Sequence, residues 1–147
     1  MKQHYYESVE LSYYGLTLLS FLKESHPDKA NDNDFIITRA DLAAETYEKA
    51  LLNGHTQQQA EELATGILFK GLHFSQLDTV IAILWNEFSD YVSQDDARKV
   101  ALKLLPHLQT VFDRYELYDD FAYSLQYEQL YTELVGAILI YFQEYDI

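Results

Sequence analysis

The sequence contains no cysteine, so disulfide bonds and metal sites built on thiolates are excluded. Glycine occurs only five times, and the glycines form neither a phosphate-binding loop nor the Gly-x-Ser-x-Gly turn of a hydrolase. The longest apolar run, Leu134–Phe142, has nine residues, whereas a membrane-spanning helix needs about 20. The N-terminus carries Lys2, Glu7 and Glu10 and lacks a small-residue cleavage site, so it does not resemble a signal peptide. These absences predict a cytoplasmic protein that does not enter a membrane.

Basic side chains are scarce as well. There are 10 of them against 24 acidic ones, which gives a formal net charge of −14. No lysine or arginine lies between Lys70 and Arg98, or after Arg114, although those two stretches hold five and seven acidic residues. Such a surface repels phosphate backbones and anionic lipids and attracts basic proteins or cations. The acidic surface therefore excludes direct nucleic-acid binding. The same charge would keep the protein soluble even if it had no partner.

Length and hydrophobic content indicate one domain. A chain of 147 residues, 48% of them hydrophobic, can bury about 68–70% of the surface that its unfolded form exposes. Apolar residues recur with a helical period along nearly the whole chain, and no strand pattern appears. We therefore predict an all-α fold, a single multihelical domain of five or six helices with short loops over residues 11–147. Residues 1–10 form a separate N-terminal segment and are a candidate for disorder.

The first half of the chain predicts three helices. The first ends before Pro27, the second ends at Asn53–Gly54, and the third begins at Thr56, which has capping-box spacing to Gln59. The residues expected to face inward are Leu11, Tyr14, Leu18 and Leu22, then Ile36, Ala40, Ala43, Tyr47, Ala50 and Leu51, then Ala60, Leu63, Ala64, Ile67 and Leu68. The alanines of the second helix indicate a closely packed neighbour.

A histidine, a serine and an aspartate lie together at His73, Ser75 and Asp78, which raises the question of a hydrolase triad. Gly71 follows the last inward residue of the third helix, as a left-handed helix end requires. Ser75 has the position of an N-cap, and Asp78 has the position of a first-turn anion that the helix dipole favours. The motif is therefore interpreted as a helix boundary, with the His73 ring covering the joint between two helices.

Two further helices follow. The first is expected from Gln76 to about Tyr91, and the second begins at Ser93 and continues through Pro106, either as one kinked helix or as two short ones. The inward stripes are Leu77, Val80, Ile81, Leu84, Phe88 and Tyr91, widened by Ile83 and Trp85, and then Ala97, Val100, Ala101, Leu104, Leu108, Val111, Phe112 and Tyr115. The broad first stripe predicts a helix packed on more than one side.

The last helix carries a stripe rich in tyrosine. Its spacing of four and three residues joins Tyr127, Tyr131, Leu134, Ile138, Tyr141 and Tyr145. Packing on a neighbouring helix is the default interpretation of such a stripe. A partner or homodimer surface is the alternative, because tyrosine is enriched at interfaces. The candidate interaction face consists of Trp85, Tyr127, Tyr131, Tyr141 and Tyr145.

No catalytic, cofactor-binding or metal-ligating residues are predicted. No glutamate precedes a histidine by three residues, as a di-iron bundle requires. The loop at residues 28–35 lacks the glycine and the final glutamate of a calcium loop. The stretch around residues 60–80 resembles a helix-turn-helix, but the helix that would read DNA has no lysine or arginine. A site assembled from distant residues would not be visible in these patterns.

Five blocks of the sequence, taken together, resemble one family. The blocks are LSYYGLTLLSFLKESHPD (11–28), RADLAAETYEKAL (39–51), GLHFSQLDTVIAILWNEF (71–88), ALKLLPHLQTVFDRY (101–115) and DDFAYSLQYEQLYTELVGAI (119–138). They are similar to a Bacteroidetes domain-of-unknown-function family (number 1896). The resemblance covers the chain from about Leu11 to Ile147. It implies a small cytoplasmic helical protein, often carried on conjugative transposons, and it brings no catalytic residues.

Three hypotheses for function follow. The first is a non-enzymatic protein-interaction or accessory module of a bacterial mobile element, which docks a protein partner or a second copy through an aromatic helix face. The second is an acidic mimic of DNA that occupies a basic nucleic-acid-binding protein. The third is an unrecognised enzyme, which a deep pocket with convergent polar groups would support. Salt separates the first two, because charge mimicry weakens steeply with ionic strength.

Overall fold

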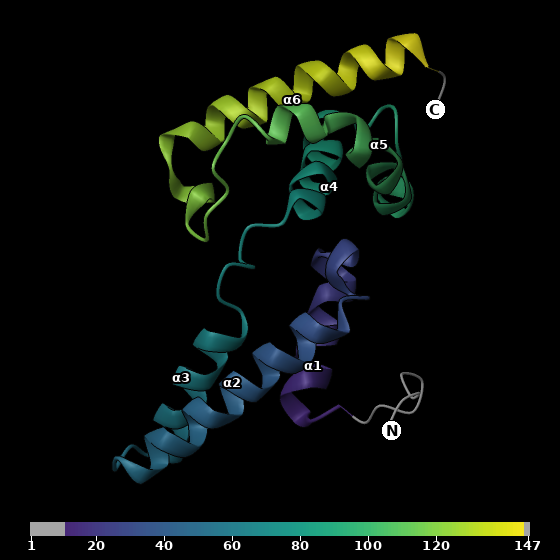
Figure 1. Ribbon diagram of the computed structural model, residues 1–147. Coiled ribbons are helices and arrows are strands. Elements are labelled where there is room, and N and C mark those ends of the chain that lie inside the picture. The colour runs from purple at the N-terminus through teal and green to yellow at the C-terminus, as the bar shows by residue number, and fades with distance from the viewer. Residues whose placement is uncertain (1–10, 146–147) are drawn as a thin grey trace. The chain divides into compact units, whose positions relative to one another are not determined.

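The computed structural model describes residues 11–145, and all regular structure in that range is helical (Figure 1). Six α-helices are present: α1 (Tyr13–Ser25), α2 (Asn33–Leu52), α3 (Gln57–Leu68), α4 (Gln76–Glu87), α5 (Ala97–Phe112) and α6 (Leu125–Glu144). Three short 3₁₀ segments accompany them: η2 (Pro27–Lys29), η3 (Gln94–Asp96) and η4 (Phe121–Tyr123). The predicted all-α fold class is confirmed. The expected N-terminal segment, residues 1–10, lies outside the described residues.

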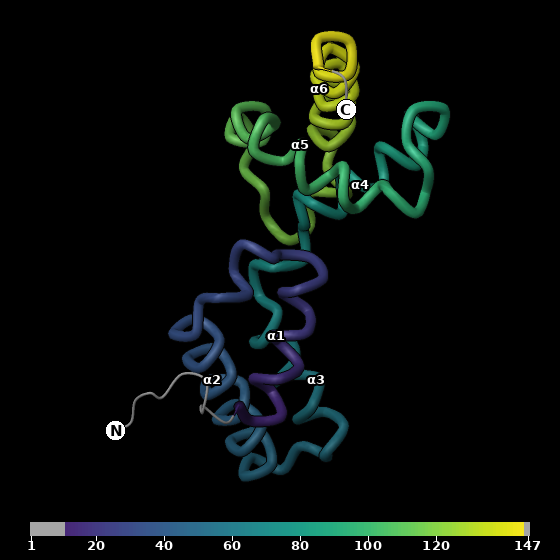
Figure 2. Tube along the Cα trace, turned by 90° about the vertical axis from the view of Figure 1, so that its right-hand side faces the viewer, coloured from purple at the N-terminus to yellow at the C-terminus, as the bar shows by residue number. Residues whose placement is uncertain are grey.

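The helices form two compact units, which meet in the sequence at Lys70 and Gly71. The first unit contains α1, α2 and α3, and the second contains α4, α5 and α6 (Figure 2). Helical periodicity gave no indication of this subdivision, because it reports which face of a helix is buried and not which helices cover it. The domain limits expected at residues 11 and 147 stay a prediction.

Small residues hold the first unit together. Its main contact joins α2 to α3, and α1 packs on α2. Ala40, Ala43, Ala60 and Ala64 are all buried, so the backbones of α2 and α3 can approach closely. This confirms the close-packed neighbour predicted from the alanines.

Two leucines that were expected in the core of this unit are exposed to solvent. Leu51 is 41% exposed and Leu63 is 47% exposed, so their placement on the inward stripe was wrong. The physical reason is that a helix pair joined by alanines buries a narrow strip, and residues at its margin remain in water.

Local signals in the sequence set the helix ends. Thr56 and Gln59 form the predicted capping box, in which the Gln59 N–H donates to Thr56 Oγ1 at 3.1 Å and the Thr56 N–H donates to Gln59 Oε1 at 3.0 Å. Ser75 accepts from the Asp78 N–H at 3.0 Å, and Ser93 opens η3 in the same way. Gly71 adopts a φ of +83°, which favours glycine.

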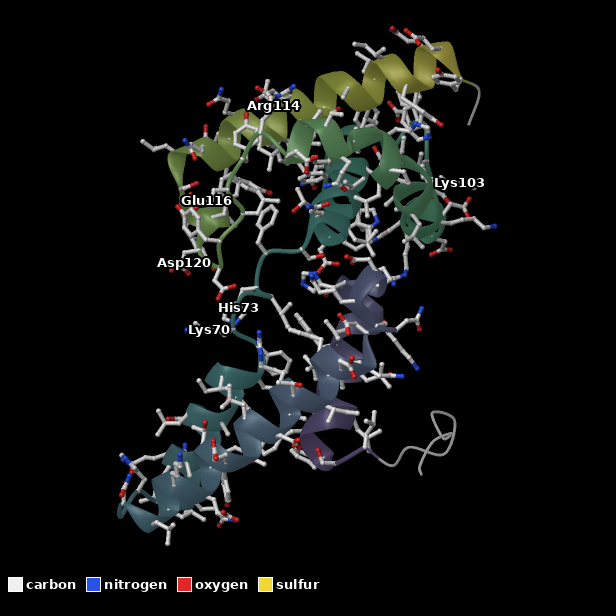
Figure 3. All side chains as sticks on the ribbon, viewed as in Figure 1. Lys70, His73, Lys103, Arg114, Glu116 and Asp120 are labelled. Atoms are coloured by element: carbon white, nitrogen blue, oxygen red, sulfur yellow. The ribbon has the colours of Figure 1, made fainter. Side chains whose placement is uncertain are left out.

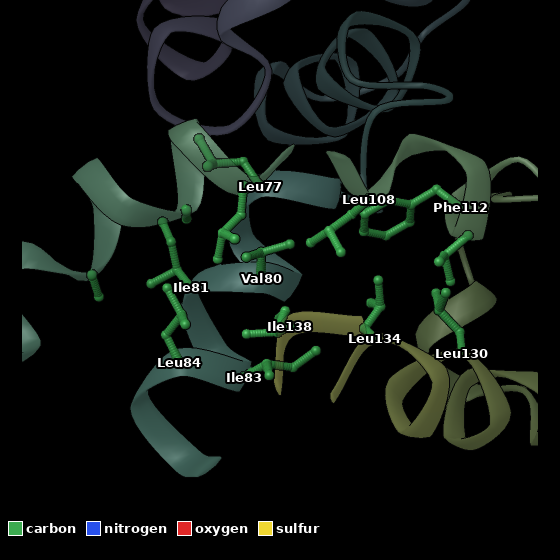
Figure 4. Packing of buried hydrophobic residues seen from close by; sticks show 14 of the residues in the cluster. Leu77, Val80, Ile81, Ile83, Leu84, Leu108, Phe112, Leu130, Leu134 and Ile138 are labelled. Atoms are coloured by element: carbon green, nitrogen blue, oxygen red, sulfur yellow. The ribbon is translucent and has the colours of Figure 1, made fainter. Parts of the chain in front are cut away.

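The second unit has an aliphatic core between α4, α5 and α6 (Figure 4). Its most deeply buried side chains include Ile83, Leu84, Leu104, Leu108, Phe112, Leu130, Leu134 and Ile138, each no more than 1% exposed. Helix α5 runs through Pro106 as a single helix, which decides between the two alternatives left open by the sequence.

Helix α4 is shorter than predicted. It ends at Glu87 with Phe88 as its C-cap, whereas the apolar stripe suggested an end near Tyr91. Phe88 is buried, but Tyr91 is 62% exposed and Trp85 is 48% exposed, so neither belongs to the inward stripe. The backbone turns after Phe88, where the Tyr91 N–H donates to the Phe88 carbonyl at 2.9 Å.

Candidate interaction surface

The stripe of α6 that carries the tyrosines faces the rest of the second unit. Leu134 and Ile138, at its centre, are fully buried. Tyr127, Tyr131 and Tyr141 are partly buried and pack at the edge of the same core. The middle of the stripe therefore packs on neighbouring helices, as the default interpretation predicts. The three tyrosines lie at the edge of that packed region.

Tyr127 and Tyr131 lie in the first half of α6, and their side chains contact other residues of the second unit. The Tyr127 ring lies 6.3 Å from the rings of both Phe74 and Phe121. The Tyr131 hydroxyl donates to Glu87 Oε2 at 2.9 Å. Burial raises the pKa of both phenols above the ordinary value for tyrosine. These two residues join α6 to its own unit.

The other end of α6 is different, because its aromatic rings contact each other and also reach the surface. Tyr141 lies 4.6 Å from Tyr145 and 4.8 Å from His107 of α5, measured between ring centroids. Tyr91 stacks on Phe142 with a centroid distance of 5.5 Å and an interplanar angle of 11°. These are two separate groups of rings, which α6 carries at the consecutive residues Tyr141 and Phe142. We call the residues of both groups together the C-terminal aromatic cluster: Tyr91, His107, Tyr141, Phe142 and Tyr145.

Much of this cluster is in contact with water. Tyr91 is 62% exposed and Tyr145 is 55% exposed. The outer side of α6 adds Leu139 and Ile140, which are 36% and 55% exposed. Tyrosine supplies a large, rigid contact area with a polar tip, which suits an interface more than an exposed position in a monomer. The cluster is therefore one of the exposed apolar surfaces of the second unit.

The candidate residues predicted from the sequence thus separate into three places. Tyr141 and Tyr145 lie in the C-terminal aromatic cluster, and Tyr127 and Tyr131 lie near the start of α6. Trp85 lies on α4, where its indole N–H donates to the Gln94 carbonyl at 3.4 Å and ties it to η3. The structure does not bring the five residues into one face.

Sequence reasoning missed three members of the cluster, Tyr91, His107 and Phe142. The apolar stripe predicts Tyr91 on the inside of a longer α4. Its contact with Phe142 joins residues 51 positions apart, so no local spacing could reveal it. The His107–Tyr141 contact has the same origin, because it depends on how α5 crosses α6.

Some charged side chains of the second unit have a favourable neighbour within that unit. Arg114 Nη2 donates to Glu133 Oε1 at 2.8 Å, and this bond lowers the pKa of the Glu133 carboxyl. Asp78 lies in the first turn of α4, where the helix dipole favours an anion. Lys99 and Lys103 are exposed on α5, eight and four residues before His107, respectively. A short basic stripe on α5 therefore leads to the aromatic cluster.

The His73, Ser75 and Asp78 group has the geometry of a helix boundary. Ser75 Oγ accepts the Asp78 N–H, and His73 Nδ1 lies 3.9 Å from Asp119 Oδ2. The helix-boundary interpretation is confirmed for Ser75 and Asp78. The expected covering of the joint by the His73 ring stays a prediction, and the acidic neighbour of His73 is Asp119. In residues 11–145 no group of three or more histidine, aspartate or glutamate side chains could hold a metal ion. None of the described helices is long and apolar enough to cross a membrane.

Comparison with known proteins places the chain in a family. A family model described as "Domain of unknown function (DUF1896)" matches residues 6–147. The crystal structure of protein PG0816 from Porphyromonas gingivalis is similar, with 38% sequence identity, 92% of each chain covered and a TM-score of 0.87. No curated protein matches the sequence.

Proposed function

We propose that this chain, which belongs to the family described as Domain of unknown function (DUF1896), is a non-enzymatic protein-interaction or accessory module. In this proposal the C-terminal aromatic cluster docks a partner protein, and the helices of the second unit hold the cluster in place. The proposal keeps the cytoplasmic location and the mobile-element setting that the family resemblance implies.

One observation carries the proposal: Tyr91 and Tyr145 are more than half exposed although each ring contacts another aromatic ring. Ring contacts limit the motion of both side chains, so little conformational entropy remains to be lost when a partner covers them. The apolar area left in water is also available for burial against a partner, which is favourable. Rigid, exposed aromatic side chains of this kind are typical binding hot spots.

A pull-down from host lysate tests this function. Purified wild-type protein, a Tyr91→Ser/Tyr145→Ser double variant and a Tyr123→Ser control are immobilised and washed at low and then high salt. Tyr123 is a matched control because it is 89% exposed and lies on η4, away from the cluster. We expect one partner that survives the salt wash on wild type and on Tyr123→Ser and is lost from the double variant.

Two outcomes would contradict the proposal. A partner retained equally by all three proteins would place the docking surface elsewhere. A basic nucleic-acid-binding protein that salt releases from all three would favour the acidic DNA mimic. Two carboxylates that such a mimic could use are already engaged within the second unit, because Asp119 accepts from the Gly71 and His73 N–H groups and Glu133 accepts from Arg114.

A further inference from the structure

Arg39 closes the C-terminal end of α3 inside the first unit. Its Nη1 donates to the carbonyl oxygens of Ile67 and Leu68 at 3.2 Å each and to that of Lys70 at 2.7 Å. The guanidinium carbon also lies 4.8 Å from the ring centroid of Phe35, which limits its motion. One side chain thus satisfies three carbonyls at the end of the helix, where intrahelical donors run out.

In the second unit, Asp119 accepts hydrogen bonds from the backbone, whereas Arg39 donates them in the first unit. It lies between α5 and η4, and its carboxylate accepts from two backbone N–H groups ahead of α4. Oδ2 accepts from Gly71 at 2.9 Å and Oδ1 accepts from His73 at 3.0 Å. Both are charge-assisted hydrogen bonds, which are roughly twice as strong as neutral ones.

The carbonyl of Lys70 and the N–H of Gly71 belong to the same peptide group. Figure 3 labels Lys70, which contributes the carbonyl, and His73, which lies two residues beyond Gly71. Its oxygen is bound by a side chain 31 residues earlier, and its nitrogen by a side chain 48 residues later. Each contact is internal to its own unit. A peptide in a connecting segment would ordinarily have only water as its partner.

We propose that the Lys70–Gly71 peptide is a latched connection, in which the Asp119 carboxylate is the latch. Release of Asp119 frees the Gly71 and His73 N–H groups together and opens residues 71–74 as a local unit, while α4, α5 and α6 stay folded. The latch is suited to release because Asp119 lies outside the helices and its side chain is 29% exposed. The inference stands independently of the proposed function.

Trypsin tests the latch directly, because Lys70–Gly71 is itself a bond that trypsin cleaves. The rate of cleavage after Lys70 is measured by mass spectrometry under limiting protease, where it follows the population of the open form. Cleavage after Lys103, in the middle of α5, serves as the internal reference for unfolding of the second unit.

Asp119→Ala removes both acceptors, and we expect cleavage after Lys70 to rise by on the order of tenfold or more relative to Lys103. Asp119→Asn keeps one acceptor and should give an intermediate rise. Asp120→Ala, which removes the same charge one residue later, should stay within about twofold of wild type. An unchanged rate after Lys70 in Asp119→Ala would overturn the proposal. A rise shared equally by Lys103 would also overturn it, because it would show unfolding of the whole unit.

Discussion

Ile138→Ala should weaken the second unit far more than Tyr145→Ala, seven residues further along the same stripe of α6. Ile138 is fully buried, and its truncation removes three carbon atoms, worth about 2.4 kcal/mol at ~0.8 kcal/mol per carbon. The cavity left behind adds to this, so the total should fall within about 2–5 kcal/mol. Tyr145 is 55% exposed and contacts Tyr141, so its truncation should cost less than about 1.5 kcal/mol.

The assay is urea unfolding followed by the fluorescence of Trp85, which is the only tryptophan in the chain. Because Trp85 lies on α4, its signal reports the second unit even if the first unfolds separately. With a slope near 1 kcal/mol per molar urea, Ile138→Ala should lower the midpoint by roughly 2 M or more. If too little folded protein remains, Ile138→Val should cost about 0.5–1.5 kcal/mol. Equal costs for Ile138→Ala and Tyr145→Ala would refute the assignment of core and surface along α6.

Three other predictions concern single contacts. Ser75→Ala removes the N-cap of α4 and should cost about 1 kcal/mol in the same fluorescence assay; an unchanged midpoint would argue against the cap. Tyr131→Ala, for which a fully buried aromatic would predict about 3–5 kcal/mol, should cost only about 1–2 kcal/mol, because the side chain is partly exposed. Burial and the hydrogen bond to Glu61 raise the pKa of Tyr14 well above its ordinary value. The folded state therefore holds this proton more tightly than the unfolded state, so its contribution to stability is complete below about pH 10 and is lost as the pH rises through the raised pKa. Tyr14→Phe should flatten the fall in stability above pH 10, measured by circular dichroism, and an identical slope would contradict the assignment.

The parts of the fold that the sequence predicts are those decided within a few residues. The Thr56 capping box and the Ser75 cap each depend on a residue three positions away, and the positive φ of Gly71 uses the conformational freedom of glycine itself. The apolar stripe that keeps its register on both sides of Pro106 indicated helix on both sides, but it left open whether α5 is one helix or two. Such signals act before any tertiary contact forms, so they can be read in advance.

The errors come from contacts between distant segments. Leu51 and Leu63 fit their helical stripes, but the alanine contact between α2 and α3 leaves them at its margin. Tyr91 fits the stripe of α4, but it leaves the helix and stacks on Phe142. The Arg39 and Asp119 contacts also join residues more than 25 positions apart. No periodicity reports such pairs.

For the same reason, the sequence identified only Tyr141 and Tyr145 among the residues of the C-terminal aromatic cluster. Spacing along α6 identified Tyr141 and Tyr145 as a pair, since residues four apart share a helix face. It could not separate them from Tyr127 and Tyr131, because the difference lies in what α4 and the η4 segment place beside each end of the helix. Ring contacts divide the tyrosine stripe, and exposure sets Tyr145 apart from the other three. Both depend on the tertiary fold.

The central claim is that the C-terminal aromatic cluster contacts another protein. The most direct test replaces Tyr145 with the photo-crosslinking residue p-benzoylphenylalanine in the host cell, with the same replacement at Tyr123 as the control. Irradiation should give a discrete covalent adduct from position 145, with another protein or with a second copy of the chain, and none from position 123. The absence of an adduct at 145, or the same adduct from both positions, would contradict the claim.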